Sequence, residues 1–267
     1  MRATGNRQPL AGIGVLVTRP EHQSHRLAEL IRSLGGEPLL FPAIEIVAQP
    51  DAATAPVLKR LALFDLAIFI SPNAARLAMQ RIAQAGGLPG GLRLAALGPG
   101  TAAELKKFGV REMITPEADF DSEALLEAMS GLQFAGKSVV IFRGQGGREL
   151  LGESLRQRGA EVEYVECYRR ARPRHDLAEL MPQWQRGRLG ACLATSSEIV
   201  INLFDMAGEA CRPWLCQTPM FVSHPRVAAT AFVFGIRTVF VAGTGDDALA
   251  SGLETWFARL RQVQPVT

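Results

Sequence analysis

Short polar loops follow most of the apolar runs in this chain, and they carry the residues best suited to hold a ligand. Each loop offers hydroxyl groups, glycines or an arginine just before a segment with helical spacing. Backbone amides at helix N-termini, with hydroxyl groups beside them, form good sites for anions. The loops are Thr18-Arg19-Pro20, Ser71-Pro72-Asn73, Gly98-Pro99-Gly100-Thr101, residues 143–148, Thr195-Ser196-Ser197, Ser223-His224-Pro225-Arg226 and Gly243-Thr244-Gly245. A ligand with several carboxylates on a wide body would suit such a ring of loops.

The same loops also have a purely structural interpretation, because caps and turns need serine, threonine and glycine even where nothing binds. Residues 98–101 and 143–148 do not have the spacing of a dinucleotide fingerprint or a phosphate-binding P-loop, so no nucleotide cofactor is expected. No nucleophile elbow, histidine motif or carboxylate pair stands out for catalysis. Tyr168, one of two tyrosines, is the exception. It could either face a ligand or simply pack with its hydroxyl at a wet edge.

Composition limits the classes of protein that this chain can belong to. With 267 residues, 48% hydrophobic and 21% charged, it is long and apolar enough for one large or two small globular domains. The net charge of +3 is too small to indicate nucleic acid. Residues 1–10 lack a signal-peptide core, and the apolar run 61–70 is short and broken by Asp65, so a cytoplasmic protein without a membrane partner is expected. Cys211 and Cys216 are the only close cysteine pair, and nothing nearby completes a metal site.

Two strand–helix–strand units each occur twice, in the order A-B-A-B. The equivalent positions are Arg19 and Arg143, Gly35 and Gly159, Ser71 and Ser196, and Gly98 and Ser223, at spacings of 124, 124, 125 and 125 residues. Alternating strands and helices specify parallel sheets with helices on both faces. The fold class predicted is therefore α/β, with two similar lobes, each a parallel sheet flanked by helices. In such sheets ligands bind beyond the carboxyl ends of the strands, where the loops stand.

Two ways of dividing the chain into lobes agree with this repeat. A contiguous division would place residues 13–135 and 138–260 in separate lobes. In the other division, residues 10–42 plus 171–262 form lobe 1, and residues 43–170 form an inserted lobe 2. Two extended segments, near 38–47 and 162–170, are longer than a core strand needs and could serve as a two-stranded crossover. We favour the inserted arrangement, with the ligand in the cleft between the lobes.

The order and spacing of several short motifs resemble the uroporphyrinogen-III synthase family. The resemblance covers nearly the whole chain, from residue 15 to residue 253. The matching stretches are Ile70-Ser71-Pro72-Asn73-Ala74, residues 97–102 with Leu105 and Gly109, Arg143-Gly144 with Gly147-Arg148, Gly159-Ala160, and Cys167-Tyr168. One departure is the late loop Ser223-His224-Pro225-Arg226, where other members have a Gly-Pro-Thr-Thr-like sequence.

The resemblance implies a cyclising hydro-lyase of porphyrin, tetrapyrrole and heme biosynthesis. Such an enzyme converts hydroxymethylbilane to uroporphyrinogen III, with inversion of the last pyrrole ring and loss of water, and uses no cofactor or metal. It further implies the inserted lobe, and a monomer that receives its substrate from hydroxymethylbilane synthase. Because the substrate ionises readily, positioning and modest acid assistance are the tasks left to the protein.

The same resemblance suggests which residues do this work. Tyr168 is the catalytic candidate, assisting the departing hydroxyl. The substrate-binding candidates are Arg19, Ser71, Thr101, Arg143, Arg148, Thr195, Ser196, Ser197 and Arg226. The alternative function is a two-lobed small-molecule binding or sensor module without catalysis, against which stand the missing signal peptide and the missing DNA-binding segment.

Overall fold

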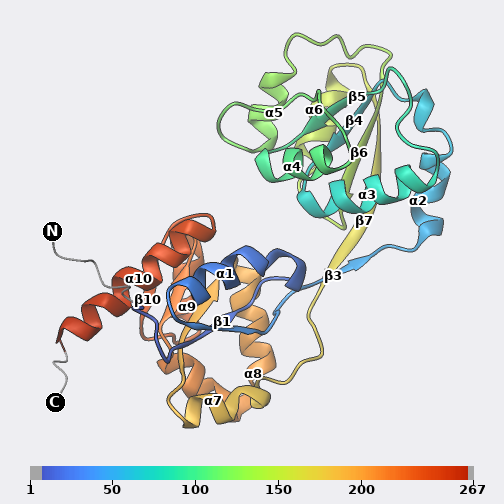
Figure 1. Cartoon of the computed structure of the whole chain (residues 1–267). Coiled ribbons are helices and arrows are strands. Elements are labelled where there is room, and N and C mark those ends of the chain that lie inside the picture. The colour runs from blue at the N-terminus through green and yellow to red at the C-terminus, as the bar shows by residue number, and fades with distance from the viewer. Residues whose placement is uncertain (1–7, 264–267) are drawn as a thin grey trace, which may run out of the picture. The chain divides into compact units, whose positions relative to one another are not determined.

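The computed structural model describes residues 8–263 of the chain and contains two sheets of five strands each, in which parallel pairs predominate (Figure 1). The described residues separate into two compact units. The chain up to Glu45 and the chain from Ala171 onward form unit 1, and Ile46–Arg170 form unit 2. No helix among residues 8–263 has the length and apolarity needed to cross a bilayer.

Sheet A belongs to unit 1 and takes its strands from both ends of the chain. Its strands, in spatial order, are β10 (Val239–Val241), β9 (Met220–Val222), β8 (Leu189–Ala194), β1 (Gly14–Val17) and β2 (Glu37–Leu40). All neighbouring pairs are parallel. Because β1 lies between β2 and β8, segments about 170 residues apart in the chain share one core.

Helices cover sheet A because apolar residues recur at helical spacing in each connection. The helices of unit 1 are η1 (Glu21–Gln23), α1 (His25–Ser33), η3 (Leu177–Leu180), α7 (Met181–Gln185), α8 (Ser197–Gln217), α9 (Pro225–Val233) and α10 (Asp246–Val263). Leu27 and Ile31 of α1 pack with Leu249 and Leu253 of α10 in one apolar cluster against the sheet. Helix α1 ends where Gly35 adopts a left-handed conformation (φ 85°), as its sequence position predicts.

Sheet B belongs to unit 2. Its strands, in spatial order, are β3 (Glu45–Ala48), β7 (Glu161–Ala171), β6 (Ser138–Gly144), β4 (Leu66–Phe69) and β5 (Arg93–Ala96). The helices of unit 2 are α2 (Asp51–Leu58), η2 (Leu61–Leu63), α3 (Pro72–Gln84), α4 (Pro99–Lys107), α5 (Ser122–Ala128) and α6 (Leu150–Gln157). Alternate residues of β4 enter two different apolar clusters, Ala67 and Phe69 with α3, and Leu66 and Ile68 with α5 and α6. Strands buried on both faces explain why the sequence shows continuous apolar runs there.

The chain passes between the two sheets at two places. It leaves sheet A after β2 and enters sheet B at β3, and it leaves sheet B after β7. Strands β3 and β7 are neighbours in sheet B, and the backbone N–H of Gln49 donates to the carbonyl of Cys167 over 2.9 Å. The predicted fold class, with its parallel sheets, flanking helices and two-stranded crossover, is confirmed.

Candidate functional site

The hydroxyl groups of Ser71 and Tyr168 meet at the carboxyl edge of sheet B. Ser71 follows β4 and caps α3, accepting a hydrogen bond from the backbone N–H of Ala74 over 3.1 Å. Pro72 fits the first helical position, where a missing N–H costs nothing. The Oγ of Ser71 also lies 3.1 Å from the Oη of Tyr168, which comes from the far end of β7. Two residues 97 positions apart in the chain thus share one hydrogen bond.

Tyr168 is a packed residue, only 3% exposed, in the apolar cluster between sheet B and α3. Its ring packs closely against Gly144 at the end of β6, where a Cβ would come within 2.7 Å of the ring Cζ. Any side chain at position 144 would therefore displace the tyrosine. Of the two interpretations left open for Tyr168, the packing one describes its ring, while its hydroxyl points to the polar edge at Ser71.

The loop after β5 lies beside the loop after β4. A Cβ on Gly100 would stand 3.3 Å from the ring of Pro72, so the two helix N-termini, of α3 and α4, come close together. Thr101 is in the first turn of α4 and is buried. Phe120 covers Gly98 in the same region and is 52% exposed. Sequence reasoning missed this phenylalanine, although Asp119 beside it has a positive φ of 50°, which is unusual for a residue other than glycine.

Arg143 holds its own loop together. Its guanidinium is buried and donates to the carbonyl of Gly146 over 3.0 Å and to the carboxylate of Glu149 over 2.8 Å. It also lies 4.6 Å from the ring centroid of Tyr164. The hydrogen bond from Arg143 keeps the pKa of Glu149 below its usual range, whereas burial raises the pKa of Tyr164. Sequence reasoning did not identify Glu149 as the partner of this arginine.

The other arginine of that loop has a different environment. Arg148 is 75% exposed at its side chain, and its nearest acidic group is the carboxylate of Glu123, 4.0 Å away. The two arginines proposed together from the sequence are thus separated by the structure. Arg143 is an internal brace of the loop, and Arg148 is an exposed surface cation with one long ion pair.

The corresponding edge of sheet A carries Arg19. Its guanidinium is paired with the carboxylate of Asp246, in the first turn of α10, and both side chains are largely buried. Thr18 is also buried, and its hydroxyl donates to the carbonyl of Leu193 in β8. Arg19 therefore ties the end of β1 to α10, a partner 227 positions away that sequence spacing does not reveal.

The three hydroxyl residues after β8 have three different roles. Ser196 caps α8 and accepts from the backbone N–H of Ile199 over 3.2 Å. Ser197 accepts a hydrogen bond from the hydroxyl of Thr230, on α9, over 2.8 Å. Thr195 contributes its carbonyl, to which the hydroxyl of Ser223 donates over 3.0 Å. All three hydroxyl residues are partly exposed, at the edge where the sequence placed them.

The loop after β9 supplies the histidine that caps the next helix, α9. The Nδ1 of His224 accepts from the backbone N–H of Arg226 over 3.1 Å, at the start of α9. Arg226 is exposed in the first turn of that helix. His224 thus does the capping that a threonine or serine would usually do at this position.

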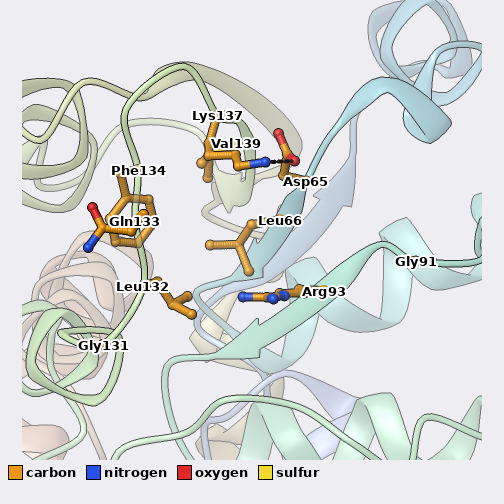
Figure 2. A pocket seen from close by; sticks show the side chains of 10 residues that line it. All are labelled: Asp65, Leu66, Gly91, Arg93, Gly131, Leu132, Gln133, Phe134, Lys137 and Val139. Atoms are coloured by element: carbon orange, nitrogen blue, oxygen red, sulfur yellow. Dashed lines mark hydrogen bonds and ion pairs between the residues drawn. The ribbon is translucent and has the colours of Figure 1, made fainter.

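Groups outside these loops offer little chemistry. Burial raises the pKa of Cys167 and of Cys192 to about 12, so neither thiol ionises near neutral pH. Within residues 8–263 no three His, Cys, Asp or Glu side chains gather in a way that could hold a metal ion. A pocket of about 460 Å³ does exist in unit 2, but it lies at the opposite, amino-terminal edge of sheet B, beside Leu66, Arg93 and Val139 (Figure 2).

Comparison with known proteins shows which family combines these loops and sheets. The family model described as uroporphyrinogen-III synthase HemD matches residues 25–248. The chain belongs to the uroporphyrinogen-III synthase family. The uroporphyrinogen-III synthase of Salmonella typhimurium is 34% identical over 246 residues, which are 91% of this chain and 100% of that protein. The enzyme of the same name from Escherichia coli is 32% identical over 249 residues, with 91% and 100% covered.

A solved structure agrees at the level of the fold. A mutant uroporphyrinogen III synthase from Thermus thermophilus superposes with a TM-score of 0.59 at 22% identity, covering 94% of this chain and 100% of that one. The resemblance noted from the sequence motifs is thereby confirmed. The loops described above are the segments that follow the strands in this member of the family.

Proposed function

We propose that this protein is a uroporphyrinogen-III synthase that converts linear hydroxymethylbilane to the cyclic type III product. The observation that carries the proposal is the hydroxyl pair of Ser71 and Tyr168 at the carboxyl edge of a parallel sheet, 3.1 Å apart. This edge is where open α/β sheets bind their ligands. Family membership supplies the reaction, and the hydroxyl pair supplies a proton donor for it.

The reaction depends on the orientation of the substrate's two ends more than on strong acid–base groups in the protein. Protonation of the terminal hydroxyl releases water and leaves a resonance-stabilised azafulvene on the substrate. Attack from the substituted carbon of the last pyrrole then gives a spiro intermediate, and its rearrangement inverts that ring before closure. A site that holds the two chain ends in register selects this path over direct closure. Only the departure of water needs a proton from the protein.

Ser71 and Tyr168 can deliver that proton together. A hydroxyl has one proton to donate and two acceptor positions. When Tyr168 donates to Ser71, both acceptor positions of Ser71 are filled, because the N–H of Ala74 occupies the other. The Ser71 proton is then free for a ligand, and Ser71 is partly exposed whereas Tyr168 is not. In this proposal Tyr168 assists the leaving hydroxyl through Ser71.

The carboxylates of the substrate meet two kinds of partner in this proposal. Arg148 and Arg226 are exposed and can approach a carboxylate directly. Arg19 and Arg143 are held by Asp246 and Glu149, so they act by shaping their loops. The N-termini of α3, α4, α8 and α9, with Thr101, Thr195, Ser196 and Ser197 beside them, add backbone amides and hydroxyl groups.

The proposal extends to the setting in which the enzyme works. We propose that it works in the cytoplasm as a monomer, with residues 43–170 inserted as a lobe between 10–42 and 171–262. Hydroxymethylbilane synthase would hand over the unstable substrate. Cyclisation by the chain's own residues needs no cofactor.

The test is the identity of the cyclic product. Purified protein is mixed with freshly made hydroxymethylbilane, the product is oxidised, and the type I and type III isomers are separated by chromatography. We expect type III to predominate, with heat-inactivated protein as the control that yields the spontaneous type I isomer. Type I alone in the presence of folded protein, or saturable binding without turnover, would contradict the proposed function.

A further inference from the structure

The pocket at the amino-terminal edge of sheet B collects three charged residues from three adjacent strands. Asp65 stands just before β4, Lys137 just before β6, and Arg93 opens β5. The segment between α5 and β6 closes the opposite side with Leu132 and Phe134 (Figure 2). The pocket volume of about 460 Å³ falls in the range of sites that hold small molecules.

Two of the three charges compensate each other. The carboxylate of Asp65 accepts from the Nζ of Lys137 over 2.9 Å and, through its other oxygen, from the backbone N–H of Ser138 over 2.9 Å. The hydrogen bond from Lys137 is the main reason why the pKa of Asp65 is lowered. Both oxygens are thus occupied, and Asp65 stays ionised at neutral pH.

Arg93 is the charge that remains. It is exposed, and within residues 8–263 its side chain makes no direct ion pair or hydrogen bond, although its charge helps to lower the pKa of Asp65. Its guanidinium extends into the space between Leu66 and Leu132 (Figure 2). Leu66, Phe134 and Val139 are buried in the apolar cluster behind it, and the half-buried Leu132, packed on that cluster, is the open apolar wall of the pocket.

We propose that this pocket binds a small carboxylate with an apolar body. The guanidinium of Arg93 would receive the carboxylate in a two-pronged hydrogen bond, a geometry in which arginine excels. The apolar part of the ligand would lie on the half-buried Leu132. The pocket is separate from the hydroxyl pair, because β4 runs from Leu66 to Phe69 and so spans about 10 Å at 3.3 Å per residue. The proposal therefore stands independently of the proposed catalytic function.

The probe for this site is 3-phenylpropanoate, titrated into the full-length 15N-labelled protein and followed by NMR. We expect saturable shifts at the amides of Gly91, Gly131 and Leu132, with a dissociation constant of roughly 0.1–10 mM for a ligand of this size. The neutral match, 3-phenylpropanamide, should bind roughly tenfold more weakly because it lacks the charge. Inorganic phosphate should bind more weakly still, because it cannot use the apolar wall.

Four variants separate this site from general attraction of anions. Arg93→Gln should weaken binding roughly tenfold, and Arg93→Lys, which keeps the charge without the planar fork, should give an intermediate loss. Asp65→Asn removes the opposing charge and should strengthen binding. Arg32→Gln, an exposed arginine of α1 in unit 1, removes the same charge and should change nothing.

Three results would overturn the proposal. One is shifts that do not saturate or that fall outside the pocket. Another is equal binding of inorganic phosphate, which would indicate an adventitious anion. The last is an affinity unchanged in both Arg93 variants, each checked as folded by the agreement of its remaining NMR signals with those of the parent protein.

Discussion

At the scale of single residues, the hydroxyl of Tyr168 is the atom whose removal tests the site most directly. Tyr168→Phe keeps the ring that packs on Gly144 and deletes only the hydrogen bond to Ser71. We expect kcat for uroporphyrinogen III formation to fall roughly 10- to 100-fold, at the low end of what acid–base assistance contributes. Stability to urea should fall by about 1 kcal/mol or less, as for one hydrogen bond.

The second tyrosine supplies the matched control for this prediction. Tyr164 lies on the same strand, β7, and its hydroxyl donates to the backbone carbonyl of Glu149 over 3.4 Å, outside the Ser71 pair. Tyr164→Phe should leave kcat within about twofold of the parent enzyme, since it keeps the ring and removes only this one long hydrogen bond. Equal losses in the two variants, or an unchanged kcat in Tyr168→Phe, would assign Tyr168 to packing alone.

The sequence predicts which residue types stand at the ends of the strands, but it does not predict which residues they contact. Ser71 and Ser196 were found because capping residues stand at a fixed place before a helix. The pairing of Arg19 with Asp246 joins positions 227 apart, and no local pattern carries that information. The same holds for Phe120 against Gly98, since an exposed aromatic in a loop has no periodic signal. Sequence reasoning thus located the loops and left their internal contacts open.

At the scale of elements, periodicity predicted the strands and helices well because each buries a regular face. Gly35 and Gly159, at equivalent places in the repeat, both adopt the positive φ that ends a helix. Helix α8 is broken into two helical pieces at Gly208 (φ 55°, ψ −174°). Apolar residues continue on both sides of that break, and the signs of it in the sequence are Gly208 itself and Pro213 shortly after, both residue types that interrupt helices.

The loop after β6 gives an element-scale prediction, since two adjacent glycines differ in what surrounds them. Gly147 has a φ of 110°, and a Cβ there would stand 3.1 Å from the buried Nη2 of Arg143. Gly146 has a φ of 71° and open space around it. Gly147→Ala should cost about 2–3 kcal/mol of stability and lower kcat, because it disturbs the arginine that braces the loop.

Gly146→Ala is the control and should cost only about 1 kcal/mol, the usual penalty of a left-handed alanine. Urea denaturation and initial rates measured on both variants separate backbone strain, which they share, from the close approach of a new Cβ to the Arg143 side chain, which only Gly147→Ala introduces. If Gly146→Ala reduced kcat as much as Gly147→Ala, loop strain alone would explain the loss, and the bracing role of Arg143 would be wrong.

At the scale of the whole molecule, the repeat indicates how many sheets there are, whereas long-range strand pairing decides which segments share one. Sheet B is built wholly from one continuous stretch of chain, from β3 to β7. Both of its apolar clusters draw their buried residues from that stretch. A segment with a complete sheet, both covering layers and its own core meets the physical conditions for folding alone.

Residues 43–171 expressed alone should therefore fold cooperatively. We expect a near-ultraviolet circular dichroism signal and a single transition in urea, with a free energy of unfolding of roughly 5 kcal/mol or more. The contiguous half, residues 13–135, is the matched control of similar length. It contains β4 and β5 but lacks β6, which lies between β4 and β7, so β4 would lose a partner strand along its whole length. It should show no cooperative transition. The opposite result, a folded 13–135 and an unfolded 43–171, would contradict the inserted arrangement. That result would mean that the pairing of β4 with β6 is not needed for folding. Both strands contribute residues to the apolar cluster on each face of sheet B, so the inserted arrangement requires this pairing.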